Sequence, residues 1–216
     1  MEAQFGSPTA SAHPVPGATP LAAPTFLMCE PSLYEVNYVI NPWMDGNVNR
    51  SSRQNAMAQW RELHAALSQV ALVMTVPPQP GCPDMVFTAN AGLVREGVVA
   101  LGSFLHPERQ VEESHFRRWF DDFGLSIREL PRVTPFEGEG DALFDPEGRR
   151  LWAGHGVRTA SSSHRFLEEA WDVEVIPLRL IDPRFYHLDT CFCPLFDGFL
   201  LYFPEAFDAA SRKRIE

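Results

Sequence analysis

The stretch EGEGDALFDPEGRRLWAGHGVRTASSSHRFLEEAWDVEVIPL, residues 137–178, holds one complete unit of the fold. EGEGDALF and RRLWAG are strand-like runs rich in apolar residues. SSSHRFLEEAW follows with helical character, and VEVIPL is another apolar run that contains a proline. We therefore predict a strand, a second strand, a helix and a third strand in this order.

The same order of elements recurs along the chain. The first unit is predicted to have extended segments at 26–29, 34–40 and 71–76 and a helix over 51–69, with Ser51 or Ser52 as N-cap. The second has strands at 84–94, 97–102 and 126–130 and a helix over 107–123, and the fourth has strands at 187–195 and 198–203 and the start of a helix at 207–216. Successive openings at Asp84, Glu137 and His187 lie about 50 residues apart, which favours an α/β architecture built of repeats.

Composition limits both the class of protein and its partners. The chain has 216 residues, 45% of them hydrophobic, which is enough for one globular domain over residues 25–216. Residues 1–24 are rich in Ala, Pro, Ser, Thr and Gly and are predicted to form a disordered tail. With a net charge of -10 and no run of Lys or Arg, the chain would be repelled by nucleic acid and by an anionic membrane, whereas a small cation would be attracted.

Localisation follows from the cysteines and from the lack of a targeting signal. Four cysteines in a chain of this length do not form the dense framework of a small disulfide-stabilised protein, so we expect a reducing cytoplasm. The N-terminus has neither the charged start of a secretory signal nor the arginines of a transit peptide. No apolar run approaches the roughly 20 residues of a membrane-spanning helix.

Polar residues at the openings of the units indicate a site. They are Asp84 and Asn90, Glu137 and Asp141, and His187 and Asp189. One such residue alone would be read as a hydrogen-bonded core group or a strand cap, but equivalent positions of successive repeats point at a common axis. Carboxylates and an amide around one histidine suit a planar cation with several N–H donors, which is a guanidinium group.

The cysteines and glycines near these openings allow other interpretations, which the spacing and charge of the residues disfavour. As one strand, residues 187–195 would place His187 and Cys191 on one face but about 13 Å apart at roughly 3.3 Å per residue, too far for the histidine to activate the thiol. Cys191 and Cys193 have C-x-C rather than C-x₂₋₄-C spacing, so we expect no metal and two buried small hydrophobes. A phosphate loop at GEGD, residues 138–141, is rejected because its acids would repel phosphate and no G-K-[ST] follows. Glycines beside acids instead allow a turn that directs a carboxylate inward.

Four stretches resemble the guanidino-group-modifying superfamily of arginine deiminases, dimethylarginine dimethylaminohydrolases and amidinotransferases. They are EVNYVINPWM (35–44), CPDMVFTANAGLV (82–94), FEGEGDALF (136–144) and FYHLDTCFCPL (185–195), and they are most similar to arginine dihydrolase-like members from bacteria and cyanobacteria. The resemblance implies a pentein, an α/β propeller of five ββαβ blades around a pseudo-fivefold axis, of which about four are present here. It also implies attack by a cysteine thiolate on the guanidinium carbon, a covalent intermediate, and no cofactor.

The resemblance also implies roles for individual residues. His187 would be the general acid/base, and Glu137 would bind the guanidinium and orient the histidine, with Glu139 as the competing assignment. The substrate-binding residues would be Asp84, Asn90, Asp189, Asn41, and Arg109 as a bidentate partner of the substrate α-carboxylate. Asn90 stands where many relatives have a carboxylate, whereas dihydrolase-like members have asparagine and can remove two nitrogens.

The implied activity is hydrolysis of arginine to ornithine, ammonia and carbon dioxide. The family nucleophile is a late cysteine that this chain lacks, so we expect a truncated enzyme or a degenerate relative with open strand edges and a tendency to form homo-oligomers. Alternatives are a citrulline-forming dimethylarginine hydrolase, amidino transfer, a non-catalytic arginine-binding module, and a zinc protein that uses His187, Cys191 and Cys193.

Overall fold

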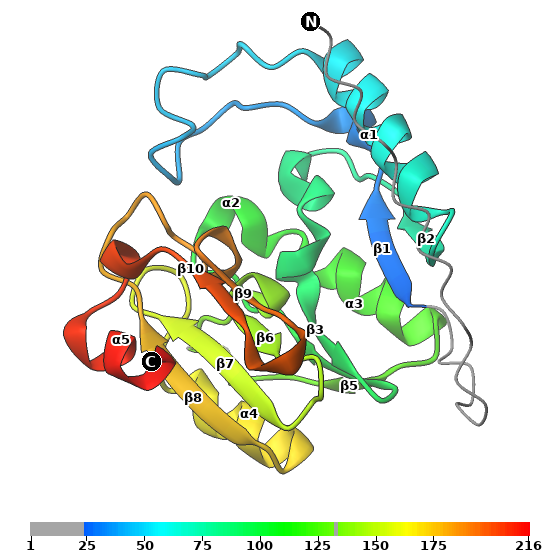
Figure 1. Ribbon diagram of the computed structural model, residues 1–216. Coiled ribbons are helices and arrows are strands. Elements are labelled where there is room, and N and C mark those ends of the chain that lie inside the picture. Colours follow the sequence, from blue (N-terminus) through cyan, green and yellow to red (C-terminus); the bar gives the residue numbers. More distant parts are fainter. Residues whose placement is uncertain (1–23, 132–133) are drawn as a thin grey trace, which may run out of the picture.

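The structure, a computed structural model, describes residues 24–131 and 134–216 (Figure 1). The tail predicted over residues 1–24 lies outside this range except for Pro24. No helix within the described ranges is both long enough and apolar enough to cross a membrane.

Two units are built alike, each from an antiparallel strand pair, a helical segment and a third, parallel strand (Figure 1). The first consists of β3 (Gly92–Arg95), β4 (Val98–Leu101), α2 (Pro107–Gln110), α3 (Glu113–Asp122) and β5 (Ser126–Arg128). The second consists of β6 (Ala142–Phe144), β7 (Arg150–His155), α4 (Ser163–Trp171) and β8 (Glu174–Arg179). The order of elements predicted from residues 137–178 is therefore confirmed.

Two further sheets contain part of the same pattern. β1 (Thr25–Cys29) pairs in parallel with β2 (Leu72–Val76) across α1 (Arg53–Leu67), as the second and third strands of a unit do. β9 (Phe192–Pro194) pairs antiparallel with β10 (Leu200–Tyr202), as the first and second strands do, and α5 (Ala209–Ile215) follows. The mixed α/β class is thus confirmed.

Local sequence accounts for the helix ends. The Ser52 hydroxyl accepts a hydrogen bond from the backbone N–H of Asn55 at 3.3 Å, so Ser52 rather than Ser51 is the N-cap of α1. Pro107 occupies the first turn of α2, as predicted. The single helix expected over 107–123 is wrong, because α2 ends at Gln110 and α3 begins at Glu113. Between them, Glu112 is fully buried and its carboxylate turns back to Arg109.

The strands predicted at the openings of the units begin later than expected. Residues 83–86, 88–91, 138–140 and 188–190 form 3-10 helices that precede β3, β6 and β9. In the 3-10 turn, the Cys191 thiol donates to the His187 carbonyl at 3.9 Å, so the separation of about 13 Å expected for one extended strand is wrong. The segment 34–40 is also irregular rather than a strand, with only its start in contact with the short 3-10 helix at 31–33.

Packing brings these turns together. Phe136, Leu151 and Leu167 belong to the hydrophobic core of the unit that contains β6 to β8. Separate cores form around Phe116 in the preceding unit and around Phe207 in the following one. The Asn90 side-chain amide donates to the Glu137 carbonyl at 3.3 Å across the first two turns. The three polar openings therefore meet at one place.

Candidate active site

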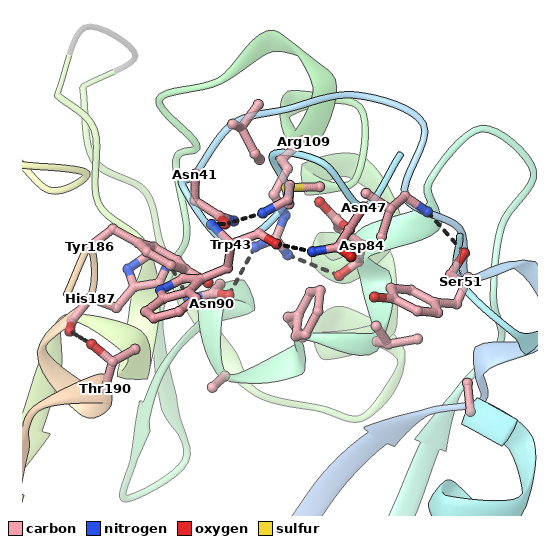
Figure 2. A pocket seen from close by; sticks show the side chains of 18 of the residues that line it. Asn41, Trp43, Asn47, Ser51, Asp84, Asn90, Arg109, Tyr186, His187 and Thr190 are labelled. Atoms are coloured by element: carbon pink, nitrogen blue, oxygen red, sulfur yellow. Dashed lines mark hydrogen bonds between the residues drawn. The ribbon is translucent and has the colours of Figure 1, made fainter. Parts of the chain in front are cut away.

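A cavity of about 800 Å³ lies between the turns at 83–91 and 188–190 and the segment between β1 and α1 (Figure 2). Figure 2 shows Tyr186, His187 and Thr190 on one side, Asn47, Asp84 and Ser51 on the other, and Asn90 and Trp43 between them. The segment between β1 and α1 covers the cavity and is called the covering segment. Two hydrogen bonds of 2.8 Å hold it to the side of the cavity formed by residues 158 and 184–190: Trp43 Nε1 donates to the Arg184 carbonyl, and Arg158 Nη2 donates to the Ile40 carbonyl. Of the residues selected from the sequence, Asn41, Asp84, Asn90, Arg109, His187 and Asp189 line the cavity.

His187 lies between two carboxylates. Its Nδ1 is 3.1 Å from Asp141 Oδ2, and its Nε2 is 3.4 Å from Glu137 Oε2. Asp141 is itself held, because it accepts hydrogen bonds from the Thr159 hydroxyl at 2.7 Å and from the Leu188 backbone N–H at 3.0 Å. A fixed acceptor at Nδ1 orients the ring and leaves Nε2 to exchange a proton.

Glu137 is the acid beside the histidine. It is fully buried and forms an ion pair with Arg158 at 3.1 Å. Glu139, the competing residue, instead accepts from the Val94 backbone N–H at 3.4 Å, and neither of the two glutamates lines the cavity itself. The turn at 138–140 therefore directs Glu137, not Glu139, toward His187.

Asp84 has one engaged and one free carboxylate oxygen. Tyr38 donates its hydroxyl proton to Oδ2 at 2.8 Å, whereas Oδ1 is buried and has no hydrogen-bond partner within residues 24–131 and 134–216. Burial raises the pKa of Asp84, although the nearby Arg109 charge opposes this. A buried, unpaired carboxylate oxygen at a cavity wall is a strong acceptor for a cationic donor.

Arg109 does not offer the bidentate pair that the resemblance implied. Its Nε and Nη2 bind the Glu112 carboxylate, at 2.8 Å for the shortest contact. Nη1 donates to Asn90 Oδ1 at 2.8 Å and Nη2 also donates to the Asp84 carbonyl at 3.2 Å. Since a bidentate contact needs two adjacent free N–H groups, neither edge of the guanidinium is open to a carboxylate in this structure.

Asp189 and Asn41 lie on the cavity wall. The side chain of Asp189 is exposed there, yet the surrounding protein removes enough of its hydration to raise its pKa to about 6, against the opposite effect of His187. The Asn41 side-chain oxygen accepts from the backbone N–H groups of Trp43 and Met44 at 3.0 and 3.1 Å, which shapes the covering segment.

Sequence reasoning missed several site residues. Arg158 pairs with Glu137 and stacks over the Tyr186 ring at 4.9 Å, and Tyr38 binds Asp84. Asp141 was noted among the polar openings, and its position four residues after Glu137 in a glycine-rich turn was a usable signal. Tyr38 lies in EVNYVINPWM, one of the stretches that carry the resemblance, which was a usable signal, whereas nothing in the sequence around Arg158 distinguishes it from an ordinary loop residue.

The cysteines lie away from the cavity. None of the four, all of which fall within the described ranges, lines it. Burial raises the pKa of both Cys29 and Cys191 to about 12, so these thiols stay protonated at neutral pH. Within the described ranges, no group of three or more His, Cys, Asp or Glu residues could hold a metal ion.

Gly140 provides the space that Asn90 occupies. A Cβ at position 140 would collide with Asn90 Nδ2 and lie 3.5 Å from the His187 ring. We expect Gly140→Ala to cost about 1–3 kcal/mol in unfolding free energy, as overpacked sites do, and to weaken arginine binding because the Asn90 amide must move. Calorimetry and thermal melts measure both effects.

Gly81→Ala is the matched control for this prediction. A Cβ at Gly81 meets no atom within 4 Å, although φ is +80°. The control should lose stability through backbone strain alone, by about 1–2 kcal/mol, with arginine affinity unchanged. Equal affinities of the two variants for arginine would contradict the assigned role of Gly140.

The fold and the site define an α/β protein with a buried histidine and carboxylate centre beside a cavity. The family described as N,N dimethylarginine dimethylhydrolase, eukaryotic, matches residues 26–215, and the chain belongs to this family.

Relatives of known type match most of the chain. The bifunctional arginine dihydrolase/ornithine cyclodeaminase AgrE of Nostoc sp. is 58% identical over 88% of this chain, which spans 27% of the length of AgrE. The N(G),N(G)-dimethylarginine dimethylaminohydrolase of Mycobacterium tuberculosis is 36% identical over 88% of this chain and 62% of its own length.

Solved structures of the N-terminal domain of ArgZ, an arginine dihydrolase from cyanobacteria, are also similar. They match with a TM-score of 0.88 and 56% identity over 89% of this chain and 71% of theirs. One is a cysteine-to-serine mutant bound to substrate, and another is an asparagine-to-serine protein covalently bound to a reaction intermediate.

Proposed function

We propose that this chain contributes the substrate-binding residues and the acid/base group of a hydrolase. This hydrolase converts arginine and two waters to ornithine, two molecules of ammonia and carbon dioxide. The observation that carries the proposal is Asp84, whose Oδ1 has no hydrogen-bond partner among the described residues, on the wall of the same cavity as His187, which lies between Glu137 and Asp141. The identities of 58% and 56% to arginine dihydrolases support arginine as the substrate.

Each residue has a part in the proposed chemistry. Asp84 and Asp189 bind the N–H groups of the guanidinium, Asn41 and the covering segment enclose it, and Asn90 contacts the reacting group. His187 takes the proton of the attacking thiol, gives it to the departing nitrogen and then takes one from the attacking water, while Glu137 and Asp141 stabilise the imidazolium between these steps. Three arginines line the cavity, Arg50, Arg109 and Arg158; Arg158 pairs with Glu137, Arg109 acts through Asn90, and the exposed Arg50 is available to a substrate α-carboxylate.

The reaction further requires a cysteine thiolate beyond the four in this chain. Cys29 and Cys191 are held protonated, and no thiol reaches the cavity within the described ranges. The cysteine-to-serine mutant of ArgZ bound to substrate is consistent with a cysteine nucleophile in that protein. The covalent reaction intermediate bound to an ArgZ variant is consistent with covalent catalysis in that protein.

We also propose that the repeats belong to a five-bladed pentein, with about four blades represented. The two complete units share strand order and pairing, and β1–β2 and β9–β10 supply complementary parts of the same pattern. Phe199 and Leu201 on the last hairpin are 69% and 63% exposed, which favours a covering element or self-association. A reducing cytoplasm remains the proposed compartment.

Product analysis tests the reaction. The complete gene product, with any residues encoded after Glu216, is incubated with arginine, and ornithine, citrulline and ammonia are quantified. Ornithine with two equivalents of ammonia supports the proposal. Citrulline as the end product contradicts it, and binding of arginine without turnover identifies an inactive arginine-binding protein.

Dimethylarginine hydrolysis to citrulline and an amine is the second candidate. The family match and the 36% identity to the mycobacterial enzyme favour it. The neutral amide of Asn90, in place of a second carboxylate, is the structural feature against it. Competition between arginine and dimethylarginine in the same assay separates the two substrates.

Arginine binding should depend on pH through Asp189. Because the pKa of this carboxyl is raised to about 6, a proton must leave it before it can pair with a guanidinium below that pH. We expect affinity to fall by up to about tenfold per pH unit below roughly pH 6. Calorimetric titrations from roughly pH 5 to 8 measure this slope. Asp189→Asn should bind more weakly at neutral pH and with a flatter pH dependence, and an unchanged slope would refute the assignment.

A further inference from the structure

Glu112 is a fully buried carboxylate that the proposed chemistry does not use. It is 0% exposed, and burial raises its pKa to about 7 although the Arg109 charge opposes this. It stands at the break between α2 and α3, and its carboxylate accepts hydrogen bonds from Nε and Nη2 of Arg109, a residue of the cavity lining. A carboxylate in such a costly place needs a compensating contact, which Arg109 provides.

The guanidinium of Arg109 is fixed in position and orientation. Glu112 binds its Nε and Nη2, and its central carbon lies 4.3 Å from the centre of the Phe104 ring. Its remaining contacts are with residues of the cavity wall, namely Asn90 Oδ1 and the Asp84 carbonyl. A purely structural ion pair would not require donors aimed at two pocket residues.

Arg109 determines which way the Asn90 amide points. An arginine N–H can only donate, so the atom facing Nη1 at 2.8 Å must be the amide oxygen. The amide nitrogen then faces the Glu137 carbonyl at 3.3 Å and His187 Nε2 at 3.4 Å. Its two N–H groups match these two acceptors.

The orientation of Asn90 bears on the state of His187. An N–H directed at Nε2 requires a lone pair there, so this orientation of the Asn90 amide favours a neutral imidazole whose proton lies on Nδ1, facing Asp141. Glu137 Oε2, also 3.4 Å from Nε2, would favour a second proton. The reversed amide would add an oxygen beside Nε2 and favour imidazolium as well.

We infer that Glu112 is a positioning residue for the acid/base centre: through Arg109 it fixes the Asn90 amide with its nitrogen toward Nε2, which keeps His187 in the neutral Nδ1–H form. Its importance to turnover rests on the proposed function. The geometric inference itself needs neither substrate nor nucleophile. In the proposed reaction, a neutral imidazole is the form that can accept a proton from water.

Nitrogen NMR of the histidine side chains tests the inference. In ¹⁵N-labelled protein at neutral pH, His187, assigned through the signal lost in His187→Ala, should show one protonated nitrogen, Nδ1, and one unprotonated nitrogen, Nε2. In Glu112→Gln the fixed carboxylate is lost, and we expect a signal from protonated Nε2 to grow. Glu112→Asp retains the charge and should keep the wild-type pattern.

Glu108→Gln on α2 is the matched control, because Glu108 is exposed on the same helix as Arg109. It should leave the His187 signals unchanged. A protonated Nε2 in the wild-type protein overturns the inference without any variant, as does a folded Glu112→Gln protein with the wild-type pattern. If Glu112→Gln does not fold, the wild-type spectrum decides. Failure of arginine turnover would leave these spectra unaffected, so the two proposals fail separately.

Discussion

Asp84→Asn is expected to weaken arginine binding by at least about 30-fold, since loss of one partner of a buried charge pair costs roughly 2–5 kcal/mol. Oδ1 of Asp84 is buried at the cavity wall without a hydrogen-bond partner among the described residues, and Oδ2 is engaged by Tyr38. In the variant the amide oxygen would still accept from Tyr38, so the NH₂ group would face the guanidinium. Two donors in contact repel, and the loss therefore exceeds that of one hydrogen bond.

Calorimetry with arginine measures this effect, and Asp45→Asn is its control. Asp45 is an exposed acid on the segment that covers the cavity, so it carries the same charge change without contact with the site. Its binding constant should stay within about twofold of wild type, the range of a screened surface charge. If Asp84→Asn and Asp45→Asn bound arginine with equal affinity, Asp84 would not be a residue that binds arginine.

Glu137→Ala is expected to lower the free energy of unfolding by about 3–5 kcal/mol, because it leaves a buried cation without its partner. Arg158 and Glu137 are 3% and 0% exposed in their side chains and 3.1 Å apart. After the substitution, Arg158 would keep the Ile40 carbonyl and the face of Tyr186 but no carboxylate at that distance. Urea unfolding monitored by circular dichroism measures the loss.

A double substitution distinguishes this cause from simple loss of packing. Glu137→Leu combined with Arg158→Met removes both charges and keeps most of the volume, so it should recover much of the stability. If the double variant were as unstable as the sum of its two single variants, the ion pair would not be the reason. Neither protein should bind arginine tightly, because both lack the contact from Glu137 to His187.

Local sequence was sufficient for several elements of the fold. The helix α1 with a serine cap at Ser51 or Ser52, the helix α4 and the strands β7 and β8 follow from apolar periodicity and capping, which act within a few residues, although only the structure chose Ser52. The spacing of the unit openings was also sufficient to group Asp84, Glu137 and His187, because repeats place equivalent residues alike. Their assignment to single strands was wrong, since short 3-10 turns at 83–86, 138–140 and 188–190 have no periodicity that distinguishes them from strand ends.

The sequence identifies most residues of the site, but it does not identify the partner that each of them contacts. From its sequence alone, the chain determines a repeated α/β fold and a set of acids, an amide and a histidine that recur at the same place in each unit, because these depend on short-range patterns. Only the tertiary structure decides that Glu137 rather than Glu139 contacts His187. It also decides that Arg109 binds Glu112 and Asn90, and that Arg158 and Tyr38 belong to the site. These contacts join residues up to 118 positions apart, and such a distance is set by the packing of whole units against one another.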